Sequence, residues 1–248
     1  MENTLYISLS RQTGLWNQLD MTANNLANIN TPGYKKVEPV FTEYLSKSTN
    51  TDHLMKDRLS YVHDMGIMRH FTEGALTATG NPLDIAIHED GFFVLETANG
   101  VRYTRNGQFK LNPDGMLTDA YGNAVLDNAN NPIFFAPTET QINISRDGTI
   151  STENGVVATL QVVDFADKQQ LQATGNGMFA TTQANPARAV AQINVEQGMI
   201  EQSNVQSVVE MTNMIKLQRA YENVQKMIDS EFTRRQVMIK EFARAGGR

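Results

Sequence analysis

The chain has 248 residues, of which 40% are hydrophobic and 19% are charged, a composition typical of globular proteins and not of disordered or collagen-like ones. Its formal net charge of −6 argues against nucleic acid as the main partner, because such proteins usually carry a basic surface. The absence of cysteine excludes disulfides, thiolate nucleophiles and cysteine-ligated metals.

The first predicted element is an amphipathic helix over residues 5–26. Seven of its positions follow strict 4-3 spacing and six of the seven are apolar, a pattern typical of a coiled-coil seam. These positions are Leu5, Leu9, Gln12, Trp16, Leu19, Ala23 and Leu26. An ordinary helix packed on its own domain produces the same pattern, so the periodicity leaves both interpretations open.

The segment ANINTPGYKK, which follows, predicts the end of this helix. Pro32 disfavours a helical conformation at Thr31, and Asn28 and Asn30 tolerate a left-handed backbone. The dipeptide Pro32-Gly33 suits a type II turn. We therefore expect the helix to stop before a tight turn.

The middle of the chain has a different pattern. Residues 35–80 are polar without a helical face, and we expect an extended connector. From Asp84 to Val195, turn signals recur about every eight residues between short strand-like runs, which predicts antiparallel hairpins in a meander or small barrel. The signals are Asn99-Gly100, Asn106-Gly107, Asp114-Gly115, Tyr121-Gly122, Asp147-Gly148, Asn154-Gly155 and Asn176-Gly177.

The last 50 residues return to a helical pattern. Ser203-Asn204 supplies an N-cap, and a seam with 3-4 spacing follows, widened by further apolar positions. The seam residues are Met214, Leu217, Tyr221, Val224 and Ile228, and the widening residues are Val208, Met211 and Ile215.

The sequence therefore predicts an α+β fold, with an amphipathic helix at each end and a central antiparallel β-rich domain. The expected boundaries are 1–34 for the first helix and its NTPGY stop, 35–80 for the connector, 81–198 for the β domain and 199–248 for the last helix.

Residues with catalytic or metal-binding chemistry are sparse. The histidines His53, His63, His70 and His88 do not have the spacing of a metal-binding motif. The run HEDG, which ends at Gly91, is interpreted as a charged hairpin turn. No aspartate-glycine loop meets the calcium pattern, and neither a nucleophile elbow nor a phosphate loop occurs. We therefore predict no catalytic residue, no cofactor site and no metal site.

Three segments, in order, resemble the flagellar rod, hook and hook-associated axial proteins, and together they cover more than half of the chain. The first helix and its stop carry the family's asparagine-rich N-terminal signature. The passage TEGALTATGNPLDIAI and the strands after it resemble the family's central β region, and QGMIEQSNVQSVVEMTNMIKLQRAYENVQKMI resembles its C-terminal helix. The residues that match the signature are Asn24, Asn25, Ala27, Asn28, Asn30, Thr31, Gly33 and Tyr34.

Within this family, the opening MENTLYISLSRQ and the passage LSYVHDMGIMRHFTEGALTATGNPLDIAI look most similar to members of the proximal rod. Members of the distal rod are the alternative. They usually carry an inserted stretch after the N-terminal signature, and this sequence has none.

The resemblance implies a structural, non-enzymatic subunit of a helical tube that transmits torque across the periplasm. It implies that the terminal helices pair as a coiled-coil-like layer and pack against copies of the chain and other rod subunits, with the β domain as an outer layer. No cofactor, nucleic acid or small-molecule substrate is expected.

The resemblance also implies export through the flagellar type III apparatus without a cleaved signal peptide. The sequence has no apolar stretch of about 20 residues and no basic and apolar secretory signal. By the general pathway these features predict a cytosolic protein, an inference that the resemblance overrides.

The asparagine string has a physical interpretation. An unsatisfied buried amide costs about 1–3 kcal/mol, so Asn24, Asn25 and Gln12 would select one packing register among many hydrophobic ones. Solvated or helix-capping amides are the alternative interpretation.

Two other classes of function stay open. A secreted binding module would expose an aromatic platform, and a hydrolase would use Asp84, Glu89 or Asp90 as its acid or base. The aromatic residues available for a platform are Phe92, Phe93, Tyr103, Phe109 and Tyr121.

Overall fold

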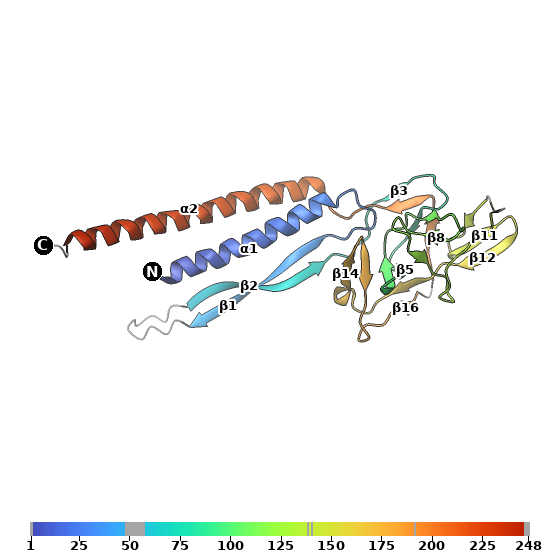
Figure 1. The fold of residues 1–248 in the computed structure, drawn as a ribbon, viewed down its shortest axis with the longest axis horizontal. Helices are drawn as coiled ribbons and strands as arrows, with labels where there is room; N and C mark the ends of the chain where they lie inside the picture. Colours follow the sequence, from blue (N-terminus) through green and yellow to red (C-terminus); the bar gives the residue numbers. More distant parts are fainter. Residues whose placement is uncertain (1, 48–57, 138, 140, 191, 246–248) are drawn as a thin grey trace. The chain divides into compact units, whose positions relative to one another are not determined.

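The computed structural model describes residues 2–47, 58–137, 139, 141–190 and 192–245. The chain forms two compact units, each built from separate stretches of sequence (Figure 1). The first unit comprises Met1–Ala27, Val37–Arg69 and Gln206–Arg248, and the second comprises Asn28–Lys36 and His70–Val205. The predicted connector, residues 35–80, is therefore divided between the two units.

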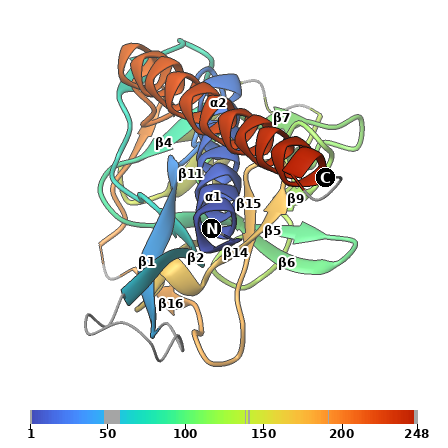
Figure 2. The ribbon, with the colours of Figure 1, turned by 90° about the vertical axis from the view of Figure 1, so that its left-hand side faces the viewer.

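The described residues of the first unit form two long helices and a pair of strands. Helix α1 spans Glu2–Ala27 and α2 spans Ser207–Ala245, while β1 (Val37–Lys47) pairs antiparallel with β2 (Arg58–Arg69). Helix α1 lies between α2 and the strand pair, and the two helices run in opposite directions (Figures 1 and 2). Both predicted terminal helices are confirmed. Neither described helix combines the length and the apolar character that a membrane span requires.

The sequence prediction missed the β1–β2 pair, which lies inside the predicted connector. Pro39 is the local reason, because proline cannot donate a ladder hydrogen bond and is disfavoured in the middle of a sheet. In the structure Pro39 lies opposite Ile67 in a two-stranded pair, where both strands are edges and an open side is available for proline. Strands of this kind have a weak sequence signal.

The second unit consists of short antiparallel strands, which confirms the prediction of a central β-rich region. In the described part of the chain its largest sheet has the order β14-β15-β6-β5-β9-β8-β7, with β13 paired to β5 and β16 paired to β13. These strands are β5 (Phe92–Thr97), β6 (Gly100–Thr104), β7 (Lys110–Leu111), β8 (Leu117–Thr118), β9 (Ala124–Val125), β13 (Val162–Asp164), β14 (Gln172–Gly175), β15 (Met178–Ala180) and β16 (Arg188–Ala189).

Smaller sheets complete the second unit. Strand β11 pairs with β10 and β12, β4 pairs with β17, and β3 pairs with β18. A short 3-10 helix, Lys168–Gln170, follows β13. The strands are β3 (Leu76–Ala78), β4 (Ile85–Ile87), β10 (Asn143–Ile144), β11 (Thr149–Thr152), β12 (Gly155–Thr159), β17 (Val195–Gln197) and β18 (Met199–Glu201).

The predicted turns have two different outcomes. Asn176 and Gly177 have φ angles of 54° and 71°, which gives the primed turn expected between β14 and β15. The prediction is wrong for Asn106-Gly107, which lies between strands that are not neighbours in the sheet. A Cβ atom on Gly107 would lie 1.6 Å from the backbone oxygen of Ile85, so the close approach of two backbones requires glycine there.

Among the described residues of the second unit, two hydrophobic clusters lie on the two faces of β5. Phe93 and Leu95 belong to one cluster, and Phe92 and Val94 belong to the other. All four side chains are at most 2% exposed, because successive residues of a strand point to opposite faces. Burying one such side chain contributes about 1.5–3 kcal/mol to the stability of the fold. Because β5 contributes to both clusters, it is the central strand of this core.

The same clusters contain most of the aromatic residues considered for a binding platform. Phe92, Phe93, Tyr103 and Phe109 are at most 8% exposed. The rings of Phe93 and Phe109 meet edge to face with 5.1 Å between centroids, a preferred aromatic geometry. Only Tyr121 of the five is exposed, at 62%. These residues therefore do not form an exposed platform.

Candidate assembly surface

The two helices of the first unit pair along their lengths. Where contacts are resolved, residue numbers fall along α2 as they rise along α1, which fixes one antiparallel register. The contacts are Ser8 Oγ to Met227 Sδ at 3.9 Å, Gln12 Nε2 to Gln225 Oε1 at 2.5 Å, the rings of Trp16 and Tyr221 at 6.1 Å, and Asn25 Nδ2 to Glu210 Oε2 at 3.4 Å.

The predicted seam of α2 is mostly covered within the chain. Val224 and Ile228 are buried, with 7% and 8% exposure, and Met214, Leu217 and Tyr221 are half-buried. Tyr221 contacts Trp16, so this face of α2 is the one that faces α1.

The predicted seam of α1 is divided. Gln12, Leu19 and Leu26 are half-buried, whereas Leu9, Trp16 and Ala23 are exposed; the side chain of Leu5 lies outside the described residues. The buried side chains of α1 are instead the polar Ser8, Thr22 and Asn25. Helix α1 packs against α2 on one side and against β1 and β2 on the other, and its buried side chains are small or carry an amide.

Apolar side chains therefore remain exposed on the helix pair. On α1, Leu9 is 51% exposed and Trp16 is 60% exposed. On α2, the exposed apolar residues gather near both ends of the helix. They are Val208, Val209 and Met211 near its start, with Ile215 one turn later, and Phe232, Val237, Ile239 and Phe242 near its end; Met227, at 46% exposed, lies between the two groups.

The end of α2 extends beyond the helix pair. Helix α2 has 39 residues and α1 has 26. In the register set by Ser8 and Met227, the first residue of α1 lies opposite a position near Arg234 of α2. The last three turns of α2 thus have no α1 residue of the described chain beside them, and there Ile239 and Phe242 are 68% and 74% exposed. Exposed apolar rows of this kind usually mark an interaction surface.

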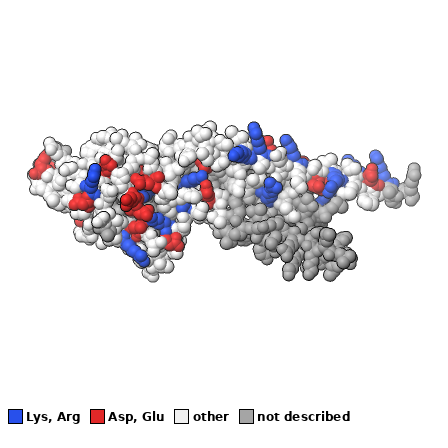
Figure 3. All heavy atoms as spheres, turned by 180° about the vertical axis from the view of Figure 1, so that it is seen from behind, with Lys and Arg blue, Asp and Glu red and all other residues white. Residues whose placement is uncertain are grey.

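Charged groups differ between the two units. In the view of Figure 3, Lys and Arg side chains are spread along the helical unit with some Asp and Glu between them, and on the β-rich unit Asp and Glu side chains gather with Lys and Arg beside them. On α2, exposed lysines such as Lys226 and Lys240 lie between the exposed apolar residues.

One member of the asparagine string, Asn25, is held by contacts within the chain. Asn25 is 2% exposed; its Oδ1 accepts from the Val37 amide at 3.0 Å and its Nδ2 donates to the Val37 carbonyl at 2.8 Å. Asn24 is exposed. The Asn25 amide therefore joins the end of α1 to the start of β1. The proposed selection of a register between subunits by Asn24, Asn25 and Gln12 stays a prediction.

The rest of the signature forms the turn after α1. The Tyr34 amide donates to the Thr31 carbonyl at 3.2 Å and Gly33 has φ +68°, which matches the type II turn predicted at Pro32-Gly33. A Cβ atom on Gly33 would lie 2.5 Å from the backbone nitrogen of Asn106. Glycine is therefore required both by the turn and by the close packing of the loop.

The remaining residues of the signature either contact a neighbour within the turn or are exposed. The Thr31 hydroxyl lies 3.2 Å from Asn28 Oδ1, a contact within the turn. Ala27 and Asn30 are exposed.

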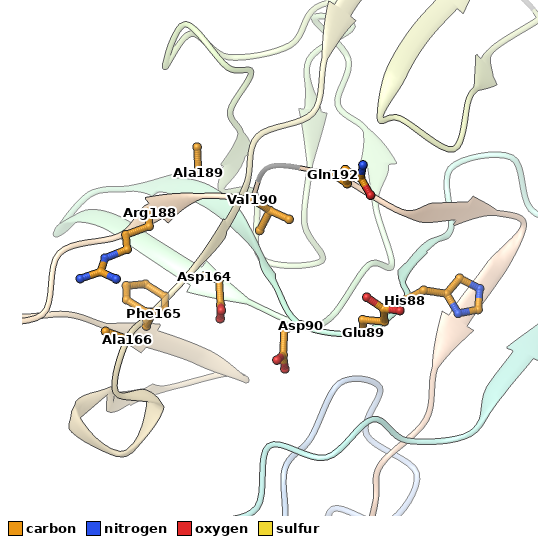
Figure 4. A pocket seen from close by; sticks show the side chains of 10 residues that line it. All are labelled: His88, Glu89, Asp90, Asp164, Phe165, Ala166, Arg188, Ala189, Val190 and Gln192. Atoms are coloured by element: carbon orange, nitrogen blue, oxygen red, sulfur yellow. The ribbon is translucent and has the colours of Figure 1, made fainter.

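The HEDG run does not form the predicted hairpin turn. Strand β4, before it, pairs with β17, whereas β5, after it, pairs with β6, β9 and β13. The run instead connects two sheets and lines an open pocket of about 380 Å³ together with Asp164, Phe165 and Arg188 (Figure 4). The pattern was misread because β4 and β5 are consecutive but not adjacent.

Asp90 and Asp164, two acidic groups of this pocket, are paired with the ammonium of Lys168. Lys168 Nζ contacts Asp90 Oδ1 and lies 3.4 Å from Asp164 Oδ1, and His88 Nε2 lies 2.8 Å from Glu196 Oε2. Within the described residues no group of three or more metal-binding side chains occurs. His53 lies outside the described residues, as does the side chain of His63.

Asp84, another acid considered for a hydrolase, has a structural environment. It is buried, and its carboxylate accepts from Thr79 Oγ1 at 2.6 Å and from Asn81 Nδ2 at 3.0 Å. These bonds fix the loop before β4.

Comparison with known proteins places three stretches in related families. The description "Flagella basal body rod protein" matches residues 5–35, "Flagellar hook protein FlgE/F/G D1 domain" matches residues 86–152, and "Flagellar basal body rod FlgEFG protein C-terminal" matches residues 196–240.

Full-length relatives agree with these matches. The chain is 38% identical to the flagellar basal-body rod protein FlgF of Caulobacter vibrioides over 231 residues, which covers 93% of this chain and 94% of the relative. It is 33% identical to FlgF of Mesorhizobium japonicum, with 90% of each chain covered. FlgG of Agrobacterium fabrum is 34% identical over 85% of this chain and 88% of the relative.

Proposed function

The chain belongs to the flagellar basal-body rod proteins of the FlgF group, structural subunits of the proximal rod, and from this premise we propose that its two terminal helices build the rod. The observation that carries the proposal is the set of exposed apolar residues on the α1–α2 pair, which continues to Phe242. In a rod, neighbouring copies and other rod subunits cover these residues and pair the helices in a coiled-coil-like layer.

The proposal assigns different roles to the parts of the chain. The helices within residues 1–34 and 199–248 form the assembly layer, residues 35–80 run between this layer and the β-rich domain of residues 81–198, and that domain forms an outer layer. Torque passes along the helical layer across the periplasm. The subunit acts mechanically and not as a catalyst, as its family membership supports.

Export through the flagellar type III apparatus, without cleavage of a signal, completes the proposal. Isolated amphipathic helices are marginally stable in water, so we expect them to fold fully only on assembly. The purified chain should therefore be a monomer whose protease-resistant core is the β-rich second unit. If the full-length chain resisted protease at low protein concentration, that result would contradict this order of folding.

A clean deletion, complemented in trans, tests the proposed function. The deletion strain should lack hook and filament, should not swim and should grow at the wild-type rate. Isolated basal bodies from the complemented strain should contain the chain. Normal filaments in the deletion strain would contradict the assignment to the rod.

A further inference from the structure

The chain passes between the two units at four points, and all four connect to one small part of the second unit. The chain enters this unit at Asn28, leaves it after Lys36, returns at His70 and leaves again after Val205. Residues 33–36, 70–75 and 201–204 lie next to these points, and we call them the junction cluster.

Backbone and amide groups join the three segments of the junction cluster to one another. The His70 amide donates to the Lys36 carbonyl at 2.9 Å, and the Gly33 amide donates to the Glu201 carbonyl at 2.8 Å. The Asn204 side chain accepts from the Lys36 amide at 2.7 Å and donates to the His70 carbonyl at 2.8 Å. Every segment is therefore bonded to the other two, directly or through Asn204.

A buried group of charges lies inside the junction cluster. Lys35 Nζ donates to Glu201 Oε1 at 2.5 Å and to the Thr72 carbonyl at 2.8 Å, and the Gly74 amide donates to the same Glu201 oxygen at 2.9 Å. Arg105 Nε lies 3.6 Å from Glu201 Oε2. The side chains of Lys35 and Glu201 are 0% exposed and that of Arg105 is 2% exposed.

These charges are costly to bury. Burial lowers the pKa of Lys35 below its ordinary value, and the attraction of Glu201 opposes this shift only in part. A buried ion pair of this kind is therefore a poor source of net stability. It does slow opening, because the two charges must separate in a medium of low dielectric before water can hydrate them.

We propose that the Lys35–Glu201–Arg105 cluster is a mechanical latch that holds the junction cluster closed when load passes between the helices and the β-rich unit. This inference rests on the proposed function of transmitting torque. The latch resists force through slow opening and not through added equilibrium stability.

The direction of the bonded segments suits such a latch. Gly33 bonds to Glu201, and Tyr34 accepts from the Asn204 amide at 3.4 Å, so both segments run in the same direction. A pull on the two chain termini then draws these segments past each other. In that geometry the bonds share the load and break together.

Stretching single full-length molecules by their two termini tests the latch directly. Lys35→Met removes the ammonium group but leaves Arg105 beside Glu201, so the buried carboxylate keeps one cationic partner and the unit still folds. The matched control is Lys110→Met, which removes an exposed ammonium that donates to the Ala120 carbonyl at 2.9 Å. Thermal unfolding of all three proteins shows whether the second unit is intact.

At a fixed force, the first unfolding step of the second unit should occur at least about tenfold faster in Lys35→Met than in the wild type. In Lys110→Met this step should occur at the wild-type rate. A thermal midpoint near the wild-type value, together with this faster opening, would support a latch. Equal opening rates for Lys35→Met and the wild type would overturn the latch, whatever the outcome of the gene deletion.

Swimming under load tests whether the latch serves the rod. A strain with Lys35→Met and a normal number of filaments should swim at wild-type speed in dilute medium and should slow or lose filaments in viscous medium. Wild-type swimming in viscous medium would overturn the load-bearing role. Normal filaments after deletion of the gene would instead contradict the proposed function and leave the stretching result unaffected.

Discussion

The side chain of Asn25 bonds to both backbone groups of one residue, accepting from the amide of Val37 and donating to its carbonyl. A buried amide that pairs with a backbone in this way replaces a missing strand neighbour at the start of β1. The same Nδ2 lies 3.4 Å from Glu210 Oε2 near the start of α2. One asparagine thus joins three elements of the first unit.

Asn25→Ala should loosen this junction. The substitution leaves both polar groups of Val37 without the side chain that satisfies them, at about 1–3 kcal/mol for each group. Hydrogen exchange of the Val37 amide in the assembled subunit should accelerate, and less of the variant should be recovered in basal bodies. Asn30→Ala, at an exposed position of the same string, is the control and should behave like wild type. Unchanged exchange at Val37 in Asn25→Ala would contradict the assigned role.

Gly33→Ala should destabilise the second unit by about 3 kcal/mol or more, because a left-handed backbone strains alanine and the new Cβ meets the backbone of Asn106. Gly80→Ala separates the two causes. Gly80 has φ +73° with no atom within 4 Å of an added Cβ, so only the strain of about 1–2 kcal/mol is expected. Thermal or urea unfolding measures the loss of stability in each variant. Equal losses in Gly33→Ala and Gly80→Ala would show that the packing of the signature loop is unimportant.

Leu19→Asp and Leu217→Asp should prevent assembly without affecting the second unit. Both leucines are half-buried on the paired helices, where an introduced charge is poorly solvated. The expected result is a chain that is exported, has wild-type thermal unfolding of its β-rich unit and is missing from basal bodies. Glu96→Lys, an exposed charge change on β5, should be nearly silent. Blots of exported protein distinguish failed assembly from failed export.

Sequence periodicity predicted the two helices well, because each carries an apolar stripe over several turns. The predicted seam of α2 is buried or half-buried within the chain, whereas the predicted seam of α1 is divided between half-buried and exposed residues. Helix α1 is covered on two sides, so Ser8 and Thr22 are buried while Leu9 and Trp16 are exposed. A single-stripe pattern cannot describe a helix in a middle layer.

Other features depended on contacts between residues far apart in the sequence. The HEDG run was assigned to a hairpin because β4 and β5 are consecutive, yet each strand pairs with other partners. Lys35 had no signal of its own, since its partner Glu201 lies 166 residues away. Lysine is rarely buried unless it is paired with an opposite charge. Its burial therefore cannot be predicted until the fold shows which carboxylate lies beside it.

The stability of the second unit should depend on Asp147 at acid pH. The Thr149 amide and hydroxyl donate to this carboxylate and hold its pKa below the ordinary value of 3.8. A carboxylate with a lowered folded-state pKa stabilises the fold above its unfolded-state pKa, and this contribution is lost as the pH falls through the folded-state value. Asp147→Asn should therefore show a shallower loss of thermal stability below about pH 4 than the wild type. Identical pH profiles would refute the assigned contribution.

The central claim is that the exposed apolar residues of the terminal helices are the surface on which the rod assembles. The most direct measurement is the amount of this chain in basal bodies isolated from cells that carry Ile239→Asp. Ile239 is 68% exposed beyond the helix pair, so the substitution should leave the β-rich unit folded and the chain exported. The control, Lys240→Asp, places the same side chain one position away, on an exposed residue outside the apolar row. The account predicts that Ile239→Asp is absent from basal bodies and that Lys240→Asp is present, whereas wild-type amounts of Ile239→Asp in swimming cells would contradict it.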